Sequence, residues 1–237
     1  MTHFGFSVKI FADGADLKAI SALAEKSYIE GFTTNPTLMS KAGIEDYPQF
    51  ARQALNLIGG RPISFEVVSD DPDEMFRQAR KIASWGDNVF VKIPITNTVG
   101  DSSVPLLQRL VDAGIKTNVT AIMTLDQVRD AVNVVGAGPS AYVSVFAGRI
   151  ADTGRDPVPI MSEALALLRP YPQLELIWAS PRELLNIVHA SGIGCHVITV
   201  TNDILAKLQM LGKDLAEYSL ETVQMFFRDA TQSGLDL

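Results

Sequence analysis

The chain has 237 residues, of which 47% are hydrophobic, and a formal net charge of −7. This length fits one large domain or two small ones, and an acidic chain without a basic stripe is not expected to bind nucleic acid. No apolar stretch approaches the roughly 20 residues that span a bilayer, and the N-terminal segment lacks the features of a signal peptide. The single cysteine, Cys195, permits no intrachain disulfide, and the three histidines show no metal-ligand spacing. We therefore expect a cytoplasmic protein without a metal, in which Cys195 is a buried apolar residue.

Short runs rich in β-branched and aromatic residues alternate with longer amphipathic runs along the chain. The short runs predict strands over residues 8–13, 31–36, 62–68, 88–95, 115–120, 141–146, 174–180 and 195–200. Helical spacing or helix-start signals predict helices over residues 14–26, 46–58, 105–112 and 124–135, and from residues 70, 157, 181 and 202. A last amphipathic helix is expected over residues 220–230, and residues 147–156 are expected to form a polar loop.

Eight strand–helix units follow one another without a domain linker or a low-complexity segment. This pattern predicts an α/β fold in which residues 1–237 form a single-domain (β/α)8 TIM barrel, with residues 220–237 as a C-terminal helix and tail. An open doubly wound sheet is the alternative. That fold usually has fewer strands and often a glycine-rich first turn, which is absent here.

One lysine, Lys92, lies inside the apolar run of residues 88–95. Burial removes the hydration of an ammonium group and favours the neutral amine, which can attack a carbonyl and form a Schiff base. The alternative is a lysine near a strand end that reaches solvent or pairs with a carboxylate. The residues at the ends of the other strands bear on this choice.

Polar side chains stand at the ends of the first seven predicted strands. They are Asp13, Asn35, Glu66, Lys92, Asn118 with Thr120, Ser144 and Ser180. A single residue of this kind is explained by helix capping or solvation. In a barrel, however, the carboxyl ends of all strands meet at one face, where the active site lies. The pattern therefore predicts a polar pocket around Lys92, in which Asp13 or Glu66 could also pair with Lys92 and keep it protonated.

Two segments resemble signatures of the transaldolase family. Residues 32–37 read Phe-Thr-Thr-Asn-Pro-Thr and are similar to its Thr-Thr-Asn-Pro motif, and residues 91–94 read Val-Lys-Ile-Pro and look like its Schiff-base lysine segment. The order Asp, Asn, Glu, Lys, Asn-x-Thr, Ser-x-Phe-x-Gly-Arg, Ser-x-Arg along successive strands also matches, from residue 8 to about residue 200. The chain length resembles the short subfamily of transaldolases and fructose-6-phosphate aldolases.

The resemblance implies a transaldolase of the Schiff-base type that uses no cofactor and acts on sugar phosphates. Lys92 would attack the C2 ketone of sedoheptulose 7-phosphate or fructose 6-phosphate, and Asp13 would take the proton of the C4 hydroxyl. Glu66 would shuttle protons through a water held near Thr120. The dihydroxyacetone unit would then pass to an aldose phosphate. The substrate-binding residues implied by the resemblance are Thr34, Asn35, Asn118, Ser144, Phe146, Arg149, Ser180 and Arg182.

Arg149 and Arg182, with Ser180, look like the phosphate-binding group of the family, because a guanidinium fork matches phosphate oxygens. The alternative for either arginine is a surface salt bridge, with Asp152 or Glu183 as partner. After Ser180 the chain reads Pro-Arg, where the family commonly has an aromatic residue before the arginine. This departure leaves the nature of the bound anion open.

Two positions separate transaldolases from the aldolases that resemble them. The chain has Glu66 and Phe146 where the aldolases typically have glutamine and tyrosine, so both resemble transaldolase. A phenyl wall without a hydroxyl suits an enamine that must be kept from water. Two other functions stay open: a Schiff-base aldolase that releases free dihydroxyacetone, and a barrel that binds a sugar phosphate without turning it over.

The resemblance also implies a homo-oligomer, such as two pentamer rings paired into a decamer. The last predicted helix carries the apolar residues Val223, Phe226 and Phe227. We expect these residues to pack on their own barrel or on a neighbouring subunit. Neither a nucleic acid nor a membrane is expected as a partner.

Overall fold

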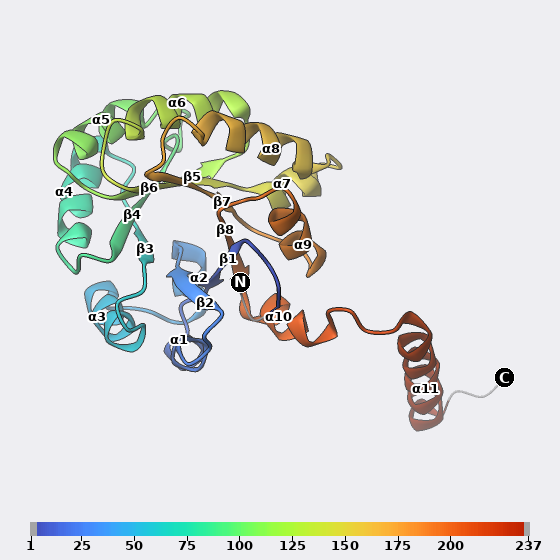
Figure 1. Ribbon diagram of the computed structural model, residues 1–237. Coiled ribbons are helices and arrows are strands. Elements are labelled where there is room, and N and C mark those ends of the chain that lie inside the picture. The colour runs from blue at the N-terminus through green and yellow to red at the C-terminus, as the bar shows by residue number, and fades with distance from the viewer. Residues whose placement is uncertain (1–3, 235–237) are drawn as a thin grey trace.

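The computed structural model describes residues 4–234 and contains a closed barrel of parallel strands (Figure 1). Each strand is hydrogen-bonded to the next in chain order, and the eighth pairs with the first. The strands are β1 (Lys9–Asp13), β2 (Ile29–Thr33), β3 (Ile63–Glu66), β4 (Val89–Pro94), β5 (Thr117–Ile122), β6 (Ala141–Val145), β7 (Leu174–Trp178) and β8 (Val197–Thr201). The expected (β/α)8 barrel is confirmed.

Helices cover the outside of the barrel, except for the last helix, which stands apart from it (Figure 1). The helices are α1 (Leu17–Ala24), α2 (Pro36–Lys41), α3 (Tyr47–Leu57), α4 (Pro72–Ala83), α5 (Val104–Asp112), α6 (Leu125–Val135), α7 (Ala147–Asp152), α8 (Pro157–Leu168), α9 (Leu185–Gly192), α10 (Asn202–Leu205), the 3₁₀ helix η1 (Ala206–Met210) and α11 (Leu215–Ser233).

Helix α7 occupies part of the segment that was expected to be a loop, so that expectation was wrong for residues 147–152. Its glycine and polar residues are typical of loops when only the sequence is considered. The Ile150 amide nevertheless donates to the Phe146 carbonyl at 3.0 Å and closes a helical turn. Gly148 also lets the helix backbone lie directly against the segment after β7, a tertiary contact that the sequence pattern does not show.

Two helix starts also differ from expectation. The sequence predicts Pro36 only as the end of a strand, but this residue begins the short helix α2, because proline suits the first helical position. The helix expected from Pro181 begins at Leu185 instead. Both differences lie at the carboxyl end of the barrel, where the chain between strand and helix forms the wall of a cavity.

The interior of the barrel is filled by an apolar cluster that is separate from the larger core between strands and helices. Its buried members are Phe11, Phe90, Tyr142, Ile177, Ala179 and Val197. Side chains two positions apart on a strand point to the same side. Asp13, Lys92 and Ser144 therefore stand one layer above Phe11, Phe90 and Tyr142, and the apolar cluster forms a floor beneath them.

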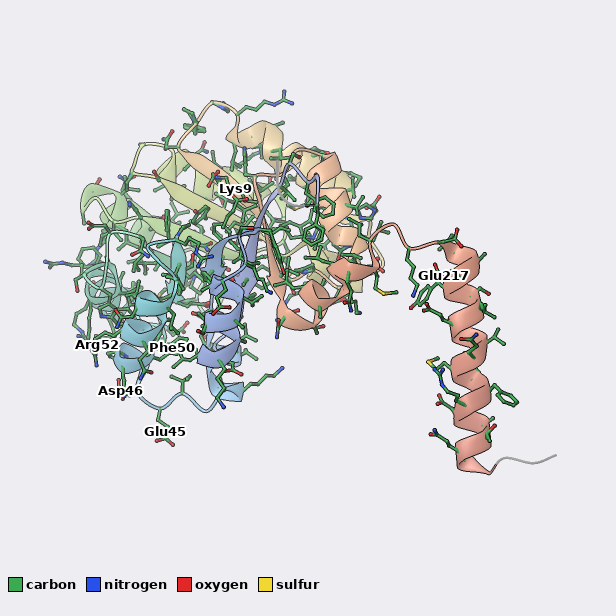
Figure 2. The ribbon with its side chains drawn as sticks, turned by 60° about the horizontal axis from the view of Figure 1, so that its bottom comes forward. Lys9, Glu45, Asp46, Phe50, Arg52 and Glu217 are labelled. Atoms are coloured by element: carbon green, nitrogen blue, oxygen red, sulfur yellow. The ribbon has the colours of Figure 1, made fainter. Side chains whose placement is uncertain are left out.

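Helix α11 stands apart from the barrel and has no buried residue (Figures 1 and 2). It is longer than the expected span of residues 220–230, because the Asp214 side chain caps it by accepting from the Glu217 amide, and Gly234 ends it at a φ of 66°. Of the two arrangements expected for this helix, packing on its own barrel is not seen, and packing on a neighbouring subunit stays a prediction. Residues 235–237 of the expected tail lie outside the described residues. None of the helices within residues 4–234 has the length and apolar character needed to cross a membrane.

Gly31 on β2 provides the space that the Phe11 ring fills inside the barrel. A Cβ at Gly31 would lie 2.5 Å from Phe11 Cζ, which is closer than carbon atoms can approach. Gly31→Ala is therefore expected to lower the free energy of unfolding by about 1–3 kcal/mol, measured by urea denaturation. Gly192→Ala, at the end of α9 with no atom within 4 Å of the added carbon, is the control and should not destabilise. Equal stability of the two variants would contradict this account of the barrel interior.

Candidate active site

A cavity of about 590 Å³ lies at the carboxyl ends of the strands. It is lined by all but one of the predicted site residues: Asp13, Asn35, Glu66, Lys92, Asn118, Thr120, Ser144, Phe146, Arg149, Ser180 and Arg182. These residues are spread over most of the sequence. The closed barrel brings them together, because all parallel strands end at the same face.

Lys92 is a buried lysine in the wall of this cavity, with 6% of its surface exposed. Its ammonium donates to the Thr34 carbonyl oxygen at 2.9 Å and lies 3.1 Å from Glu66 Oε2. Strand register makes this arrangement, since Lys92 is paired with Glu66 on β3 and with Asn118 on β5. The sequence allowed an ion pair of Lys92 with Asp13 or Glu66, and the pair with Glu66 is present. Glu66 is also the carboxylate placed to take a proton from Lys92.

Asp13 supplies a second carboxyl group to the cavity. The Thr33 hydroxyl donates to Asp13 Oδ1 at 2.7 Å, and the Thr199 hydroxyl is hydrogen-bonded to Thr33 in turn. Burial raises the pKa of Asp13 above its ordinary value, while the charge of Lys92 and the hydrogen bond from Thr33 act in the opposite direction. A carboxylate whose pKa is raised is a stronger base, which suits proton abstraction near neutral pH.

Three hydroxyl residues support the predicted site and were missed from the sequence. Thr33 and Thr199 hold Asp13, and the Ser64 hydroxyl accepts a hydrogen bond of 3.0 Å from the Asn118 amide. Ser144 donates to the other end of the same amide, at 2.7 Å from Asn118 Oδ1. The alternation of side chains along a strand could have identified two of them. Ser64 lies two positions before Glu66, and Thr199 lies two positions after Val197, so each faces the barrel interior like its neighbour.

Thr120 lies where β5 departs from regular pairing. The register with β6 shifts between Val119 and Ile122, and Ala121 has a φ of 61°, a left-handed conformation that costs a non-glycine residue roughly 1–2 kcal/mol. The Thr120 hydroxyl is buried and has no hydrogen-bond partner within residues 4–234. The bulge thus leaves the hydrogen-bonding capacity of this hydroxyl unused by the surrounding protein.

Thr34 is the predicted binding residue whose side chain does not line the cavity. Its hydroxyl donates instead to the Ser64 carbonyl oxygen at 3.2 Å, and its own carbonyl accepts from Lys92. The neighbouring Thr33 faces the cavity in its place. Asn35 lines the cavity, but its Oδ1 accepts from the Leu38 amide at 3.0 Å and caps α2, so only the side-chain amide nitrogen is available to a substrate.

The two predicted phosphate-binding arginines have different surroundings. Arg182 forms an ion pair with Asp152, one of the two partners considered for a surface salt bridge, and it also donates to Ser180. Arg149 lies over the Phe146 ring, with 5.6 Å between its central carbon and the ring centroid. The Ser180 backbone has a φ of 59°, so this side of the cavity contains a second left-handed residue.

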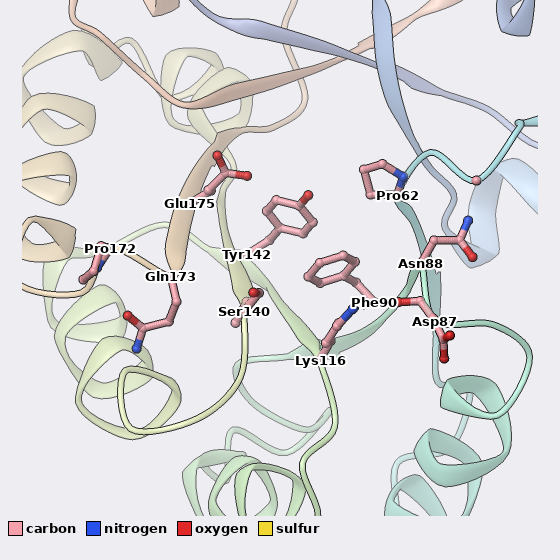
Figure 3. A pocket seen from close by; sticks show the side chains of 12 residues that line it. Pro62, Asp87, Asn88, Phe90, Lys116, Ser140, Tyr142, Pro172, Gln173 and Glu175 are labelled. Atoms are coloured by element: carbon pink, nitrogen blue, oxygen red, sulfur yellow. Dashed lines mark hydrogen bonds between the residues drawn. The ribbon is translucent and has the colours of Figure 1, made fainter.

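A second cavity, of about 530 Å³, lies at the opposite, N-terminal mouth of the barrel (Figure 3). Its lysine, Lys116, donates to the Asp87 carbonyl oxygen at 2.7 Å and lies over the Phe90 ring. Glu175 in its wall is paired with Lys9. Lys116 therefore contacts a backbone carbonyl and an aromatic ring, whereas Lys92 contacts a carboxylate.

Asp13→Asn is expected to raise the free energy of unfolding at pH 7. The amide oxygen can still accept from Thr33, and the variant no longer places a carboxylate where burial disfavours its charge. The ordinary pKa of an aspartate, 3.8, applies to Asp13 in the unfolded chain, and its folded pKa is higher. At pH values between these two pKa values the folded wild type binds more protons than the unfolded chain, so its free energy of unfolding falls as pH rises. The advantage of the variant should therefore shrink as pH falls through the raised pKa of Asp13. Urea denaturation at a series of pH values measures this, and Asp130→Asn on an exposed face of α6 is the control.

Comparisons with known proteins show the family to which this chain belongs. The sequence model of one family, described as “Transaldolase/Fructose-6-phosphate aldolase”, matches residues 10–237. Curated relatives named “Probable transaldolase”, from Streptococcus equi subsp. zooepidemicus (strain MGCS10565) and Streptococcus pyogenes serotype M5 (strain Manfredo), are each 37% identical over 202 residues. Each alignment covers 85% of this chain and 90% of the relative.

Solved structures with low sequence identity share the barrel. KGPDC from Streptococcus mutans has a TM-score of 0.56 and 11% identity, covering 83% of this chain and 89% of that chain. Dihydrodipicolinate synthase from Rhodopseudomonas palustris has a TM-score of 0.56 and 13% identity, covering 96% and 83%. These two likenesses show the fold alone. The match of the family model and the identity to the curated relatives show more: the chain belongs to the transaldolase/fructose-6-phosphate aldolase family.

Proposed function

We propose that the protein is a transaldolase that transfers a dihydroxyacetone unit from a ketose phosphate, sedoheptulose 7-phosphate or fructose 6-phosphate, to an aldose phosphate. The family contains both transaldolases and fructose-6-phosphate aldolases. The observation that carries the proposal is the geometry of Lys92, which is buried and 3.1 Å from one carboxylate oxygen of Glu66. Asp13, with its raised pKa, lines the same cavity.

In the first step Lys92 gives a proton to Glu66 and attacks the C2 carbonyl carbon as a free amine. A carbon–nitrogen bond forms, the carbonyl oxygen leaves as water after proton transfer from Glu66, and an iminium remains. The buried Thr120 hydroxyl, which has no partner within residues 4–234, is the group in this wall that can hold a water for the transfer. No metal and no cofactor take part in this scheme.

In the second step Asp13 takes the proton of the C4 hydroxyl. The C3–C4 bond breaks, its electron pair moves into the iminium to give an enamine, and an aldose leaves. The enamine carbon then attacks the acceptor aldehyde, Asp13 returns its proton to the new hydroxyl, and hydrolysis frees Lys92. Asn118 and Ser144, joined by a hydrogen bond of 2.7 Å, bind the hydroxyls of the three-carbon unit, together with the Asn35 amide nitrogen.

Two residues favour transfer over release of free dihydroxyacetone. Phe146 gives the cavity an apolar wall and has no hydroxyl that could deliver a proton to the enamine. Glu66, which contacts Lys92, is a carboxylate where the aldolases resembling this chain typically have glutamine. Arg149, Arg182 and Ser180 form the end of the cavity where the substrate phosphate binds.

Borohydride reduction in the presence of fructose 6-phosphate tests the Schiff base. Mass spectrometry should find a covalent adduct on Lys92, because hydride reduces the iminium to a stable amine. Lys92→Met should abolish the adduct, while Lys116→Met at the opposite mouth of the barrel should retain it. Absence of an adduct on Lys92 would rule out this mechanism and leave a barrel that binds sugar phosphates without turnover. The same donor should yield glyceraldehyde 3-phosphate rapidly only when erythrose 4-phosphate is present, whereas full-rate release without acceptor would indicate an aldolase.

We also propose a cytoplasmic location, which the state of Cys195 supports. This residue is a free, buried cysteine, and burial raises the pKa of its thiol to about 12. Such a thiol is unreactive, and a chain with one unpaired cysteine suits a reducing compartment.

We propose further that the protein is a homo-oligomer in which α11 packs on a neighbouring copy. Leu220, Val223 and Phe227 follow helical spacing along one side of α11 and are 57%, 60% and 74% exposed. An apolar stripe of this kind normally lies against another surface. A groove of about 860 Å³ on the barrel offers one, since its lining includes apolar residues of α1 and of the segment after β2: Leu17, Ile20, Leu23, Leu38 and Ile44.

Phe227→Glu is expected to reduce the mass of the assembly in solution, because it places a charge in the apolar stripe of α11. Light scattering coupled to size-exclusion chromatography measures the mass. Gln232→Glu adds the same charge on the opposite side of the helix and should leave the mass unchanged. A wild-type monomer, or equal masses for the two variants, would refute packing through this stripe.

A further inference from the structure

The guanidinium of Arg182 is already occupied by protein groups. Its Nε donates to Asp152 Oδ1 at 2.9 Å, and its Nη2 donates to Asp152 Oδ2 at 2.5 Å. Its Nη1 donates to both the carbonyl oxygen and the hydroxyl of Ser180, at 3.1 and 2.9 Å. A guanidinium binds phosphate best through two parallel N–H groups. Arg182 cannot offer such a pair unless it releases Asp152 or Ser180.

Arg149 lines the same cavity and is not occupied in this way. It forms no ion pair and no side-chain hydrogen bond with any residue in the described range 4–234. Its guanidinium lies over the Phe146 ring, a contact that leaves its N–H groups available. Of the two arginines at this end of the cavity, Arg149 can therefore bind an anion without first giving up a partner.

Asp152 remains ionised in a neutral assay. Hydrogen bonds from Arg182 hold the pKa of Asp152 below its usual range, and the charges of Arg182 and Arg149 act in the same direction. A phosphate that binds both arginines would lie close to this carboxylate. Like charges at short distance oppose one another, so the carboxylate lowers the net attraction of this site for a dianion.

We propose that Asp152 is a specificity-determining residue whose carboxylate competes with the substrate phosphate for Arg182. In this arrangement the phosphate binds Arg149 directly and gains Arg182 only by displacing Asp152. Affinity for phosphorylated substrates is thereby limited, while substrates without a phosphate are unaffected. The inference rests on the proposed function, because it assumes that the phosphate lies at this end of the cavity.

The ion pair is not what holds α7 against the segment after β7. A Cβ at Gly148 would lie 1.6 Å from the Ser180 carbonyl oxygen, so the two backbones are in direct contact. Arg182 and Asp152 have side chains that are 44% and 52% exposed, and exposed ion pairs contribute little to stability. Removing the charge of Asp152 should therefore leave the fold intact.

The test is Asp152→Asn, which keeps the shape of the side chain and removes its charge. The KM for fructose 6-phosphate should fall by roughly fivefold to tenfold with kcat within about twofold, while the KM for fructose stays unchanged. Inorganic phosphate, titrated calorimetrically, should bind the variant more tightly by a similar factor. Thermal denaturation checks that both proteins are folded.

Glu183→Gln is the matched control. It removes a carboxylate next to Arg182 in the sequence that forms no ion pair with any residue of the described part of the chain. Its KM and its phosphate affinity should equal those of the wild type. A higher KM in Asp152→Asn would show that Asp152 positions Arg182 for the phosphate. An unchanged KM and an unchanged phosphate affinity would show that the Asp152 carboxylate and the phosphate do not compete. Either result overturns the inference. Phosphate titration needs no turnover. It therefore tests competition by Asp152 even if no Schiff base forms on Lys92, and the two proposals can fail independently.

Discussion

The structure of the site depends on placing one ammonium group inside a barrel of apolar side chains. Lys92 is almost fully buried, and the loss of its hydration would be unfavourable without compensation. The Thr34 carbonyl and the Glu66 carboxylate provide that compensation at 2.9 and 3.1 Å. Removing one partner of such a buried pair generally costs about 3–5 kcal/mol. The same contacts that make burial possible also place a proton acceptor beside the proposed nucleophile.

The layers of the barrel interior explain how a polar site and a stable fold coexist. The apolar cluster of Phe11, Phe90 and Tyr142 excludes water from the centre of the barrel, and the polar layer of Asp13, Lys92 and Ser144 stands directly above it. The low-dielectric apolar material below this layer strengthens the electrostatic interactions among its charged groups. Hydroxyl groups then fix the polar side chains, so that the carboxyl and amide groups face the cavity in defined orientations.

The mouth of the cavity is organised differently from its floor. Contact between α7 and the segment after β7 depends on Gly148, which lets two backbones come together next to the left-handed Ser180. On this rim Arg182 pairs with the exposed Asp152, whereas the polar layer deeper in the cavity contains the buried pair of Lys92 and Glu66. At the C-terminal end of the chain, α11 stands apart from the barrel, and a groove beside α1 stays uncovered. The proposed chemistry uses the cavity at the strand ends, and the proposed assembly uses α11 and this groove.

The sequence by itself determined the alternation of strands and helices, and hence the barrel, because the periods of hydrophobic residues in strands and helices differ. It also determined that polar residues end the strands, so Asp13, Glu66 and Lys92 could be named before their distances were known. Contacts between distant segments were decided only by the tertiary structure. Hydrophobic periodicity carries no information on the hydrogen bond of Thr33 with Thr199, on the choice of Asp152 over Glu183 as the partner of Arg182, or on the turning away of Thr34 from the cavity. Each of these depends on strand register and on the close approach of backbones, which residue type and spacing do not specify.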